Sequence, residues 1–322
     1  MKIKLLLILM LCQFSLGSFA CESFFGSEKL KVLITGIQNS KDVWEGYSPA
    51  KKPVVVTDME KSSECVAIYN GTTWSFMKLR NPLYISNGVF DFYPYSQDNL
   101  ELKEHLLSLG ISRTVVMSLH NYLGNLLSRW PGGESGLYFT VLIHEGFHLH
   151  AQLGNQEWPK WVSQVEADRD RLVDECYKPY KKLLHNELKV LLDSFKSNDE
   201  LAFRNSIQSF IFLRDMRYNL YPSCRDMEAS WEMIEGVAEY VGWKSSLQQF
   251  ITKSDLLKYF EAEFERSREE EDTEYFYHLG ALQLFAINRI NNNIFQQHNP
   301  LMRAQNTKND NIYNLLKLVL KH

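Results

Sequence analysis

A cluster of histidine and glutamate occupies the run VLIHEGFHLH, residues 141–150. On a helix, His144 and His148 are separated by about 40° and can direct their imidazole rings at one point. Glu145 lies about 100° from His144 around the helix, where its carboxylate can reach a water molecule held at that point. Two neutral imidazoles that bind Zn²⁺ and a carboxylate that takes a proton from water are the parts of an H-E-x-x-H site. The sequence therefore predicts a zinc site, and a histidine-rich structural helix is the alternative.

A catalytic zinc site usually has three protein ligands and one open position. His150 follows His144 by six residues and lies on another face of a helix, so we expect it to have a structural or supporting role. The pattern H-E-x-x-H-x-x-G-x-x-H would need a glycine and a histidine where this chain has Ala151 and Gly154. The third ligand must therefore come from elsewhere in the chain.

A row of glutamates further along the chain offers this ligand. Glu228, Glu232, Glu235 and Glu239 are spaced by four, three and four residues, which places them on one face of a helix. For Glu228 we expect a solvated surface position. Apolar neighbours crowd Glu235, and a buried carboxylate needs a cation. A solvated position is therefore not expected for Glu235, and Glu232 is a fallback ligand.

These two motifs together resemble those of the gluzincin metallopeptidases, especially their aminopeptidase-like branch, whose second zinc helix reads like N-E-G-F-A-x-Y. The run EGVAEY, residues 235–240, matches Glu-Gly-x-Ala-x-Tyr, and Ile234 stands where that branch often has Asn. The resemblance implies that Glu235 is the third zinc ligand. It also implies that Glu239 is the carboxylate that orients a ligand histidine.

A third segment, EYFYHLGALQLF, resembles the Tyr-x-x-Gly stretch found downstream of the glutamate helix in the same branch. The resemblance implies that Tyr277 donates a hydrogen bond to the oxyanion of the tetrahedral intermediate and that Gly280 allows helices to approach closely. A tyrosine that only packs in the core is the alternative for Tyr277.

Two departures limit the resemblance, which covers residues 137–289. His148 and Glu235 are 87 positions apart (235 minus 148), so a helical insertion must lie between the two zinc helices. The Gly-x-Met-Glu-Asn motif, which grips the substrate amino terminus in that branch, is absent. An aminopeptidase is therefore not implied. Arg214 and Arg217 could bind a substrate carboxylate, but we expect them to form surface ion pairs.

The sequence predicts a zinc-dependent metallopeptidase that acts on a peptide or protein. Two alternatives stay open. One is an extracytoplasmic binding or scaffolding protein, with a structural metal or an inactive zincin fold. The other is a zinc hydrolase that acts on a non-peptide amide or ester.

The elements that must position these residues indicate an α+β protein with a zincin-like, mostly helical catalytic domain at residues 99–322 and a small β-rich part at residues 21–98. In the β-rich part, four runs favour strands: KVLITGI, KPVVVTDM, CVAIYNGTTWSFMKL and GVFDFYPY. From residue 99 the apolar residues recur at helical spacing. This predicts helices at residues 99–110, 112–130, 137–153, 226–249, 254–268, 273–291 and 311–321, and over most of residues 160–218.

The N-terminus predicts export from the cytoplasm. Residues 1–20 carry two lysines, a short apolar stretch and Ser18-Phe19-Ala20, which is the order of a cleaved signal peptide. The mature chain is therefore expected to be secreted or periplasmic, with a lipid anchor on Cys21 as a further possibility. Four cysteines remain, which permit two disulfides in three connectivities.

The composition bears on the partners of the chain. The net charge of −4, with basic and acidic residues mixed, argues against nucleic acid as a partner. The sequence also predicts no transmembrane helix in the mature chain.

Overall fold

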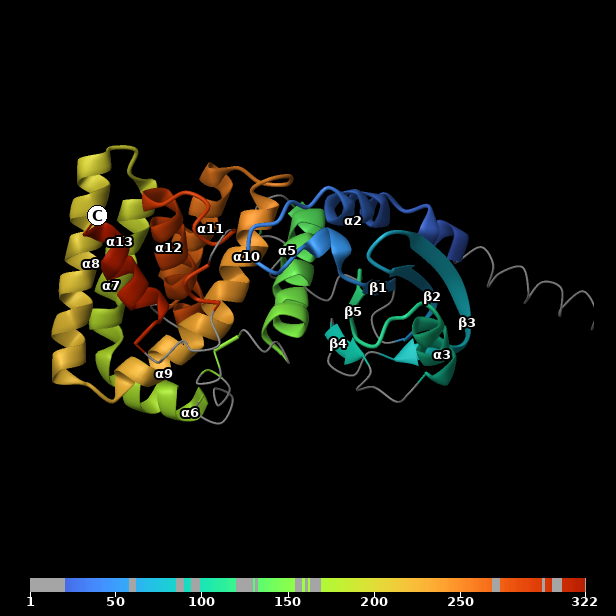
Figure 1. Cartoon of the computed structure of the whole chain (residues 1–322), viewed down its shortest axis with the longest axis horizontal. Helices are drawn as coiled ribbons and strands as arrows, with labels where there is room; N and C mark the ends of the chain where they lie inside the picture. The colour runs from blue at the N-terminus through green and yellow to red at the C-terminus, as the bar shows by residue number, and fades with distance from the viewer. Residues whose placement is uncertain are drawn as a thin grey trace, which may run out of the picture. The chain divides into compact units, whose positions relative to one another are not determined.

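A computed structural model of the chain gives two compact units, Met1–Ser40 with Pro49–Ser128, and Lys41–Ser48 with Arg129–His322 (Figure 1). We call them the sheet unit and the helical unit. The residues that the structure describes are 21–57, 62–84, 90–93, 99–119, 130, 133–153, 158–159, 162, 169–267, 273–296, 299–302 and 309–321. The expected signal peptide, residues 1–20, lies outside them. The predicted α+β class is confirmed.

The sheet unit contains a five-stranded mixed sheet in the order β3-β2-β1-β5-β4. Its strands are β1 (Val54–Thr57), β2 (Ser62–Tyr69), β3 (Trp74–Tyr84), β4 (Phe90–Tyr93) and β5 (Thr114–Ser118). β1 pairs with β5 in parallel, and the other pairs are antiparallel. The turn between β2 and β3 is closed by Asn70, whose side-chain oxygen accepts hydrogen bonds from the backbone N–H groups of Thr72 and Thr73. Asn70 and Gly71 therefore form the turn of a β-hairpin within the run CVAIYNGTTWSFMKL.

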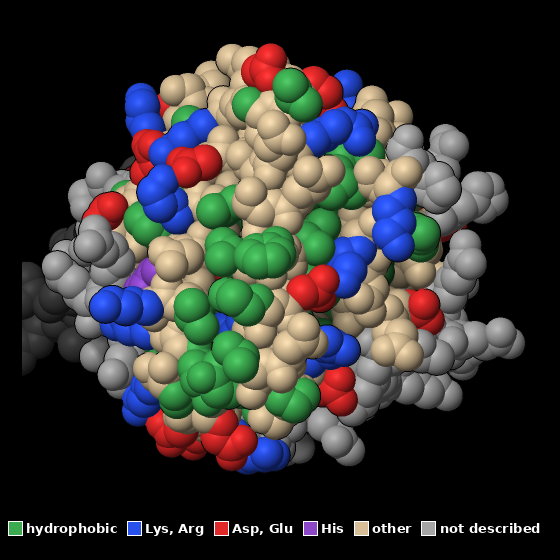
Figure 2. Space-filling model, turned by 90° about the vertical axis from the view of Figure 1, so that its left-hand side faces the viewer, with side chains coloured by type: hydrophobic (Ala, Val, Ile, Leu, Met, Phe, Trp, Pro, Cys, Tyr) green, Lys and Arg blue, Asp and Glu red, His purple; other side chains and the backbone are tan. Residues whose placement is uncertain are grey.

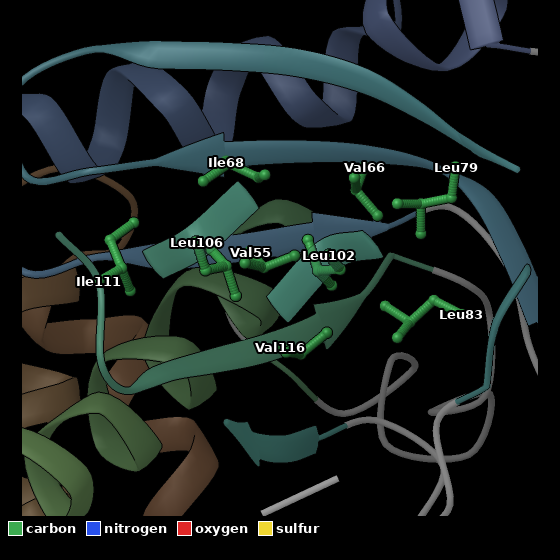
Figure 3. Packing of buried hydrophobic residues seen from close by; sticks show 9 residues of the cluster. All are labelled: Val55, Val66, Ile68, Leu79, Leu83, Leu102, Leu106, Ile111 and Val116. Atoms are coloured by element: carbon green, nitrogen blue, oxygen red, sulfur yellow. The ribbon is translucent and has the colours of Figure 1, made fainter. Parts of the chain in front are cut away.

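Apolar side chains from the sheet and from α3 (Leu100–Ser108) form one buried cluster (Figure 3). Val55, Val66 and Val116 from three different strands meet Leu102 and Leu106 of α3 there. Gly110 follows the C-cap residue of α3, Leu109, and its φ of 74° is a conformation that glycine adopts without strain. The helix predicted for this segment is therefore confirmed, including its terminal glycine.

Two sequence predictions in this unit were wrong. The run KVLITGI is not a strand but part of α2 (Glu28–Gln38), because Ser27 caps the helix and burial recurs at Leu30, Leu33 and Ile37. Helical period outweighs the β-branched composition here. The start of the helix expected over residues 112–130 is instead β5, a fully buried strand between β1 and β4. A strand buried on both faces is apolar throughout, so its sequence does not alternate.

The helical unit holds the remaining elements. They are α5 (Gly133–Phe147), the π-helical turn η3 (His148–Gln152), α6 (Arg169–Arg171), the π-helical turn η6 (Leu172–Tyr177), the short 3₁₀ helix η7 (Lys178–Tyr180), α7 (Lys181–Lys196), α8 (Glu200–Leu220), α9 (Cys224–Trp231), the π-helical turn η8 (Glu232–Gly236), α10 (Val237–Ser246), α11 (Lys253–Ser267), α12 (Glu274–Ile290) and α13 (Ile312–Leu320). Predicted helices within the described part of this unit are confirmed, with ends shifted by a few residues.

Helix α5 packs against α10 within the helical unit (Figure 1), and most of its side chains are buried. The segment Lys41–Ser48 adds aromatic side chains to this core. Trp44 meets Phe147 edge to face, and the Tyr47 hydroxyl donates a hydrogen bond to the Ile143 carbonyl at 3.2 Å. The helix that carries the histidine motif is therefore held on several sides.

Two disulfides fix the connectivity that the sequence left open. Cys21 pairs with Cys65 in the sheet unit, and Cys176 pairs with Cys224 in the helical unit. The second bond joins η6 to the start of α9. A Cys21 thiol that is bound in a disulfide cannot carry a thioether-linked lipid at the same time.

Two observations concern the surface. Among the described helices, none has the length and apolar character needed to cross a membrane. Figure 2 shows hydrophobic side chains interspersed with charged ones on the side where α7, α8 and α13 lie. Exposed large hydrophobic residues on α8 and α13 include Leu201, Phe212, Met216, Leu220 and Leu318.

Candidate metal centre

Three side chains converge in the helical unit. His144 comes from α5, His148 comes from η3, which continues α5, and Glu235 comes from η8. The two histidine Nε2 atoms are 3.0 Å apart. The Glu235 Oε2 lies 3.2 Å from the Nε2 of His148 and 3.4 Å from that of His144. The structure thus brings the two histidines and the glutamate, 87 residues further on, to one point.

These separations are those of donor atoms around one small cation. Zinc bonds of about 2.0–2.1 Å at tetrahedral angles separate neighbouring donor atoms by about 3.3 Å. The three measured separations, 3.0, 3.2 and 3.4 Å, lie close to this value. Two imidazole nitrogens and one carboxylate oxygen are also donors that zinc accepts. The residues therefore fit a zinc ion.

The site is largely shielded from water, with side-chain exposures of 12% for His144, 14% for His148 and 16% for Glu235. Burial by itself would lower the pKa of His144, but Glu235 and Glu239 outweigh burial and raise this pKa to about 10. The pKa of Glu235 would rise on burial, but His148 and His144 hold it well below its usual range. The carboxylates of Glu235 and Glu239 therefore favour positive charge at this point, on a proton or on a metal ion.

The Nδ1 of each histidine, which is not directed at the other ligands, lies next to a second polar side chain. The Glu239 Oε2 lies 3.6 Å from the Nδ1 of His144. The Gln152 Oε1 lies 2.5 Å from the Nδ1 of His148, and the Gln152 amide donates to the Ile234 carbonyl at 2.9 Å. Such partners fix the tautomer and the ring orientation of a metal-binding histidine.

Sequence reasoning proposed Glu239 but missed Gln152. A usable signal was present, because Gln152 follows His148 by four residues and therefore lies on the same helix face.

Both ligand-bearing segments include a π-helical turn. In η3 the N–H of Leu153 donates to the carbonyl of His148, five residues back, and in η8 the N–H of Val237 donates to that of Glu232. Single π turns of this kind occur often at functional sites. They widen the helix where His148 and Glu235 reach towards each other.

Helix α12 crosses η8 in direct backbone contact. A Cβ atom at Gly236 would lie 2.7 Å from the Cα of Gly280, which is too close for a side chain. The sequence prediction of close helix approach at Gly280 is thus confirmed. The contact places Tyr277, three residues before Gly280, beside the ligand turn.

Two further predicted site residues lie near the three ligands. Glu145 follows His144 on α5, is partly exposed, and makes no hydrogen bond or ion pair with any residue that the structure describes. The Tyr277 ring stacks near His144, with centroids 6.3 Å apart and planes at 20°. Its hydroxyl forms no hydrogen bond within the described part of the chain. Burial and the nearby Glu235 raise the pKa of this hydroxyl, so it stays a donor.

The structure corrects the prediction of surface positions for Arg214, Arg217 and Glu228. All three side chains are fully buried. Arg214 donates to Glu187 and Glu232, and Arg217 donates to Glu187 and Glu228. The sequence prediction failed because amphipathic charge patterns do not reveal when two charged faces are buried against each other. We call these five residues the buried ion cluster.

The buried ion cluster joins the inserted helices to the ligand turn. Its carboxylates come from α7, α9 and η8, its guanidinium groups come from α8, and the Gln283 amide of α12 donates to Glu232 at 2.9 Å. Because the carboxylate of Glu232 is engaged in this way, it does not join His144 and His148. His150 does not join them either. Glu232, the fallback ligand from the sequence, is thus not placed with the histidines.

Comparison of the chain with protein-family models, with curated proteins and with solved structures found no match.

Proposed function

We propose that this protein is a zinc-dependent metallopeptidase. The observation that carries the proposal is the convergence of His144, His148 and Glu235 at the separations of a tetrahedral zinc site. The carboxylate of Glu145, one residue from the first ligand, makes no ion pair with any described residue. The resemblance of these motifs to those of gluzincins supports a zincin-like fold for the helical unit. The comparisons with known proteins found no match, so the support comes from the motifs and the geometry alone.

Each side chain has a role in the proposed reaction. When bound, zinc supplies the Lewis acidity that makes water a nucleophile near neutral pH. Glu145 accepts the proton of that water and passes it to the leaving nitrogen of the peptide. The Tyr277 hydroxyl donates a hydrogen bond to the oxyanion as the carbonyl carbon becomes tetrahedral. Glu239 and Gln152 keep the two histidines in the required tautomer and orientation.

A structural metal site in a binding or scaffolding protein is the rival function. Structural zinc sites have four protein ligands, whereas catalytic sites leave one position open. Within the described residues, only three donors gather at this point. Glu232, the fallback ligand from the sequence, is bound to Arg214 and Gln283. A set of three protein ligands, as found among the described residues, favours catalysis.

The proposed location of the protein is outside the cytoplasm. Residues 1–20 have the pattern of a signal peptide, and two disulfides persist most readily in an oxidising compartment. The proposed substrate is accordingly an extracytoplasmic peptide or protein.

The test compares the purified mature chain with Glu145→Gln and Glu235→Ala. We expect one zinc per wild-type chain, retained in Glu145→Gln and lost in Glu235→Ala. Hydrolysis of a mixed peptide library, followed by mass spectrometry, is expected for the wild type and for neither variant. Full zinc retention in Glu235→Ala would remove this residue from the ligand set. A zinc-loaded wild type that cleaves ester or non-peptide amide substrates but no peptide would reassign the substrate class.

A further inference from the structure

His278 is a buried histidine on α12 that the proposed reaction does not use. It directly follows Tyr277 and is 4% exposed. Two aromatic rings of α11 meet it edge to face, Tyr259 with centroids 5.7 Å away and Phe260 with centroids 5.6 Å away. The imidazole is therefore enclosed and fixed in orientation.

The two ring nitrogens of His278 face carboxylates on opposite sides. Nδ1 lies 3.4 Å from the Oε1 of Glu239, and Nε2 lies 3.9 Å from the Oε2 of Glu263. Neither nitrogen makes a hydrogen bond within the described residues, so these contacts are electrostatic. Burial by itself would lower the pKa of His278, but Glu239 and Glu263 outweigh it and raise this pKa. The two carboxylates therefore favour the charged form of this imidazole.

Glu239 connects this imidazole to the candidate metal centre. Its Oε1 accepts a hydrogen bond from the Trp243 indole at 2.6 Å and also faces His278. Its Oε2 faces the Nδ1 of His144. His144 and His278 thus share one carboxylate, and the position of the oxygen near His144 depends on how the other oxygen is held.

A second metal ion beside His278 is not indicated. Glu263, Glu274 and His278 do lie close together. However, the Arg266 guanidinium forms ion pairs with both glutamates, which therefore already have a cation. The role of His278 is directed at Glu239 instead.

We infer that His278 is a positioning residue for the metal centre: it ties Glu239 to α12 and thereby fixes the ring of His144. This inference rests on the proposed zinc site. Helix α12 would then act on the site in two ways: through His278, which holds the partner of the ligand His144, and through the Tyr277 hydroxyl donor. A histidine that only fills space in the core would not act on the metal.

Two matched variants separate the two nitrogens of His278. In His278→Asn the side-chain amide takes the place of Nδ1 and can still donate to Glu239, whereas in His278→Gln it takes the place of Nε2 and faces Glu263. We expect His278→Gln and the apolar His278→Leu to weaken zinc binding about 10- to 100-fold. We expect His278→Asn to stay within a few-fold of the wild type.

The measurements are zinc affinity, by competition with a chelator, and the visible absorption spectrum of the Co²⁺-loaded chain, which reports ligand geometry. A wild-type spectrum is expected only for His278→Asn. If His278→Asn and His278→Gln have equal zinc affinities and equal spectra, and both only unfold at lower temperatures than the wild type, His278 is a packing residue. In a Glu239→Gln background, His278→Gln should have no further effect on affinity, and an undiminished effect would overturn the route through Glu239.

Zinc binding and peptide hydrolysis by the wild-type chain distinguish failure of this inference from failure of the proposed function. If it binds no zinc at His144 and His148, the zinc site fails and the role of His278 fails with it. If it binds zinc and hydrolyses peptides while all His278 variants keep wild-type affinity, only the role of His278 is overturned.

Discussion

Gln152 links His148 to the backbone of the second ligand helix: its Oε1 lies 2.5 Å from the His148 Nδ1, and its amide donates to the Ile234 carbonyl. One side chain therefore sets the orientation of a ligand and the distance between the two ligand-bearing segments. Ile234 directly precedes Glu235, so this hydrogen bond acts next to the third ligand.

Replacing Gln152 should weaken metal binding. We expect Gln152→Leu to lower zinc affinity about 10- to 100-fold, because His148 loses its orienting partner. Gln152→Glu is the matched variant, which keeps the acceptor for His148 but loses the donor to Ile234. Its affinity should lie between those of the wild type and Gln152→Leu in a chelator competition. Unchanged affinity in Gln152→Leu would show that the contact does not orient His148.

Removing a cation from the buried ion cluster should destabilise the fold. Arg214→Met leaves Glu187 and Glu232 buried without this partner, which costs about 3–5 kcal/mol in the free energy of unfolding. Arg204→Met is the control, because the Arg204–Glu200 pair is exposed and should contribute less than about 1 kcal/mol. Urea unfolding of both variants measures the difference. Similar values for the two would contradict the structural importance of the cluster.

The hydroxyl of Tyr277 should affect the rate of catalysis and not the binding of metal. We expect Tyr277→Phe to lower kcat about 10²- to 10³-fold, with zinc content and KM close to those of the wild type. Tyr180→Phe, which removes a hydroxyl away from the metal centre, is the control. Steady-state kinetics on a cleaved peptide gives both constants. If kcat is unchanged in Tyr277→Phe, this tyrosine only packs in the core.

Zinc affinity should rise with pH. Without metal, Glu235 and Glu239 outweigh burial and raise the pKa of His144 to about 10, so this imidazole is protonated near neutral pH. Zinc binds the neutral ring and must displace that proton. Apparent affinity should therefore increase about tenfold for each pH unit when one proton is displaced. Chelator competition between pH 6 and 8 tests this, and an affinity independent of pH would contradict it.

The local part of the metal centre could be predicted from sequence because it depends only on helical spacing. His144, Glu145 and His148 lie within five residues of one helix. Glu235 needed a different kind of information, since residues 87 positions apart meet only through tertiary packing. It was suggested by the resemblance of the EGVAEY run to a known zinc helix.

Other features were hidden because they depend on which faces become buried together. Arg214 and Glu228 have the spacing of surface charges, yet both are buried. The arginines of α8 form ion pairs with glutamates of α7 and α9 where these helices pack together. His278 carries no sequence motif, and its relation to Glu239 appears only when α12 packs beside α10. In β5 the tertiary setting, a central place in the sheet, overrides an apolar pattern that also suits a helix.

The π turns η3 and η8 make the metal centre depend on the length of the chain as well as on its residues. Each turn contains about one residue more than an α-helical turn of the same hydrogen-bonding role. One residue corresponds to about 100° of helical rotation, so the side chains after each turn are offset from those before it. Substitution can remove a ligand, but only insertion or deletion of a residue can alter this offset. The register of Gln152 relative to His148, and of Glu239 relative to Glu232, thus depends on the number of residues in each turn, a property that no single side chain carries.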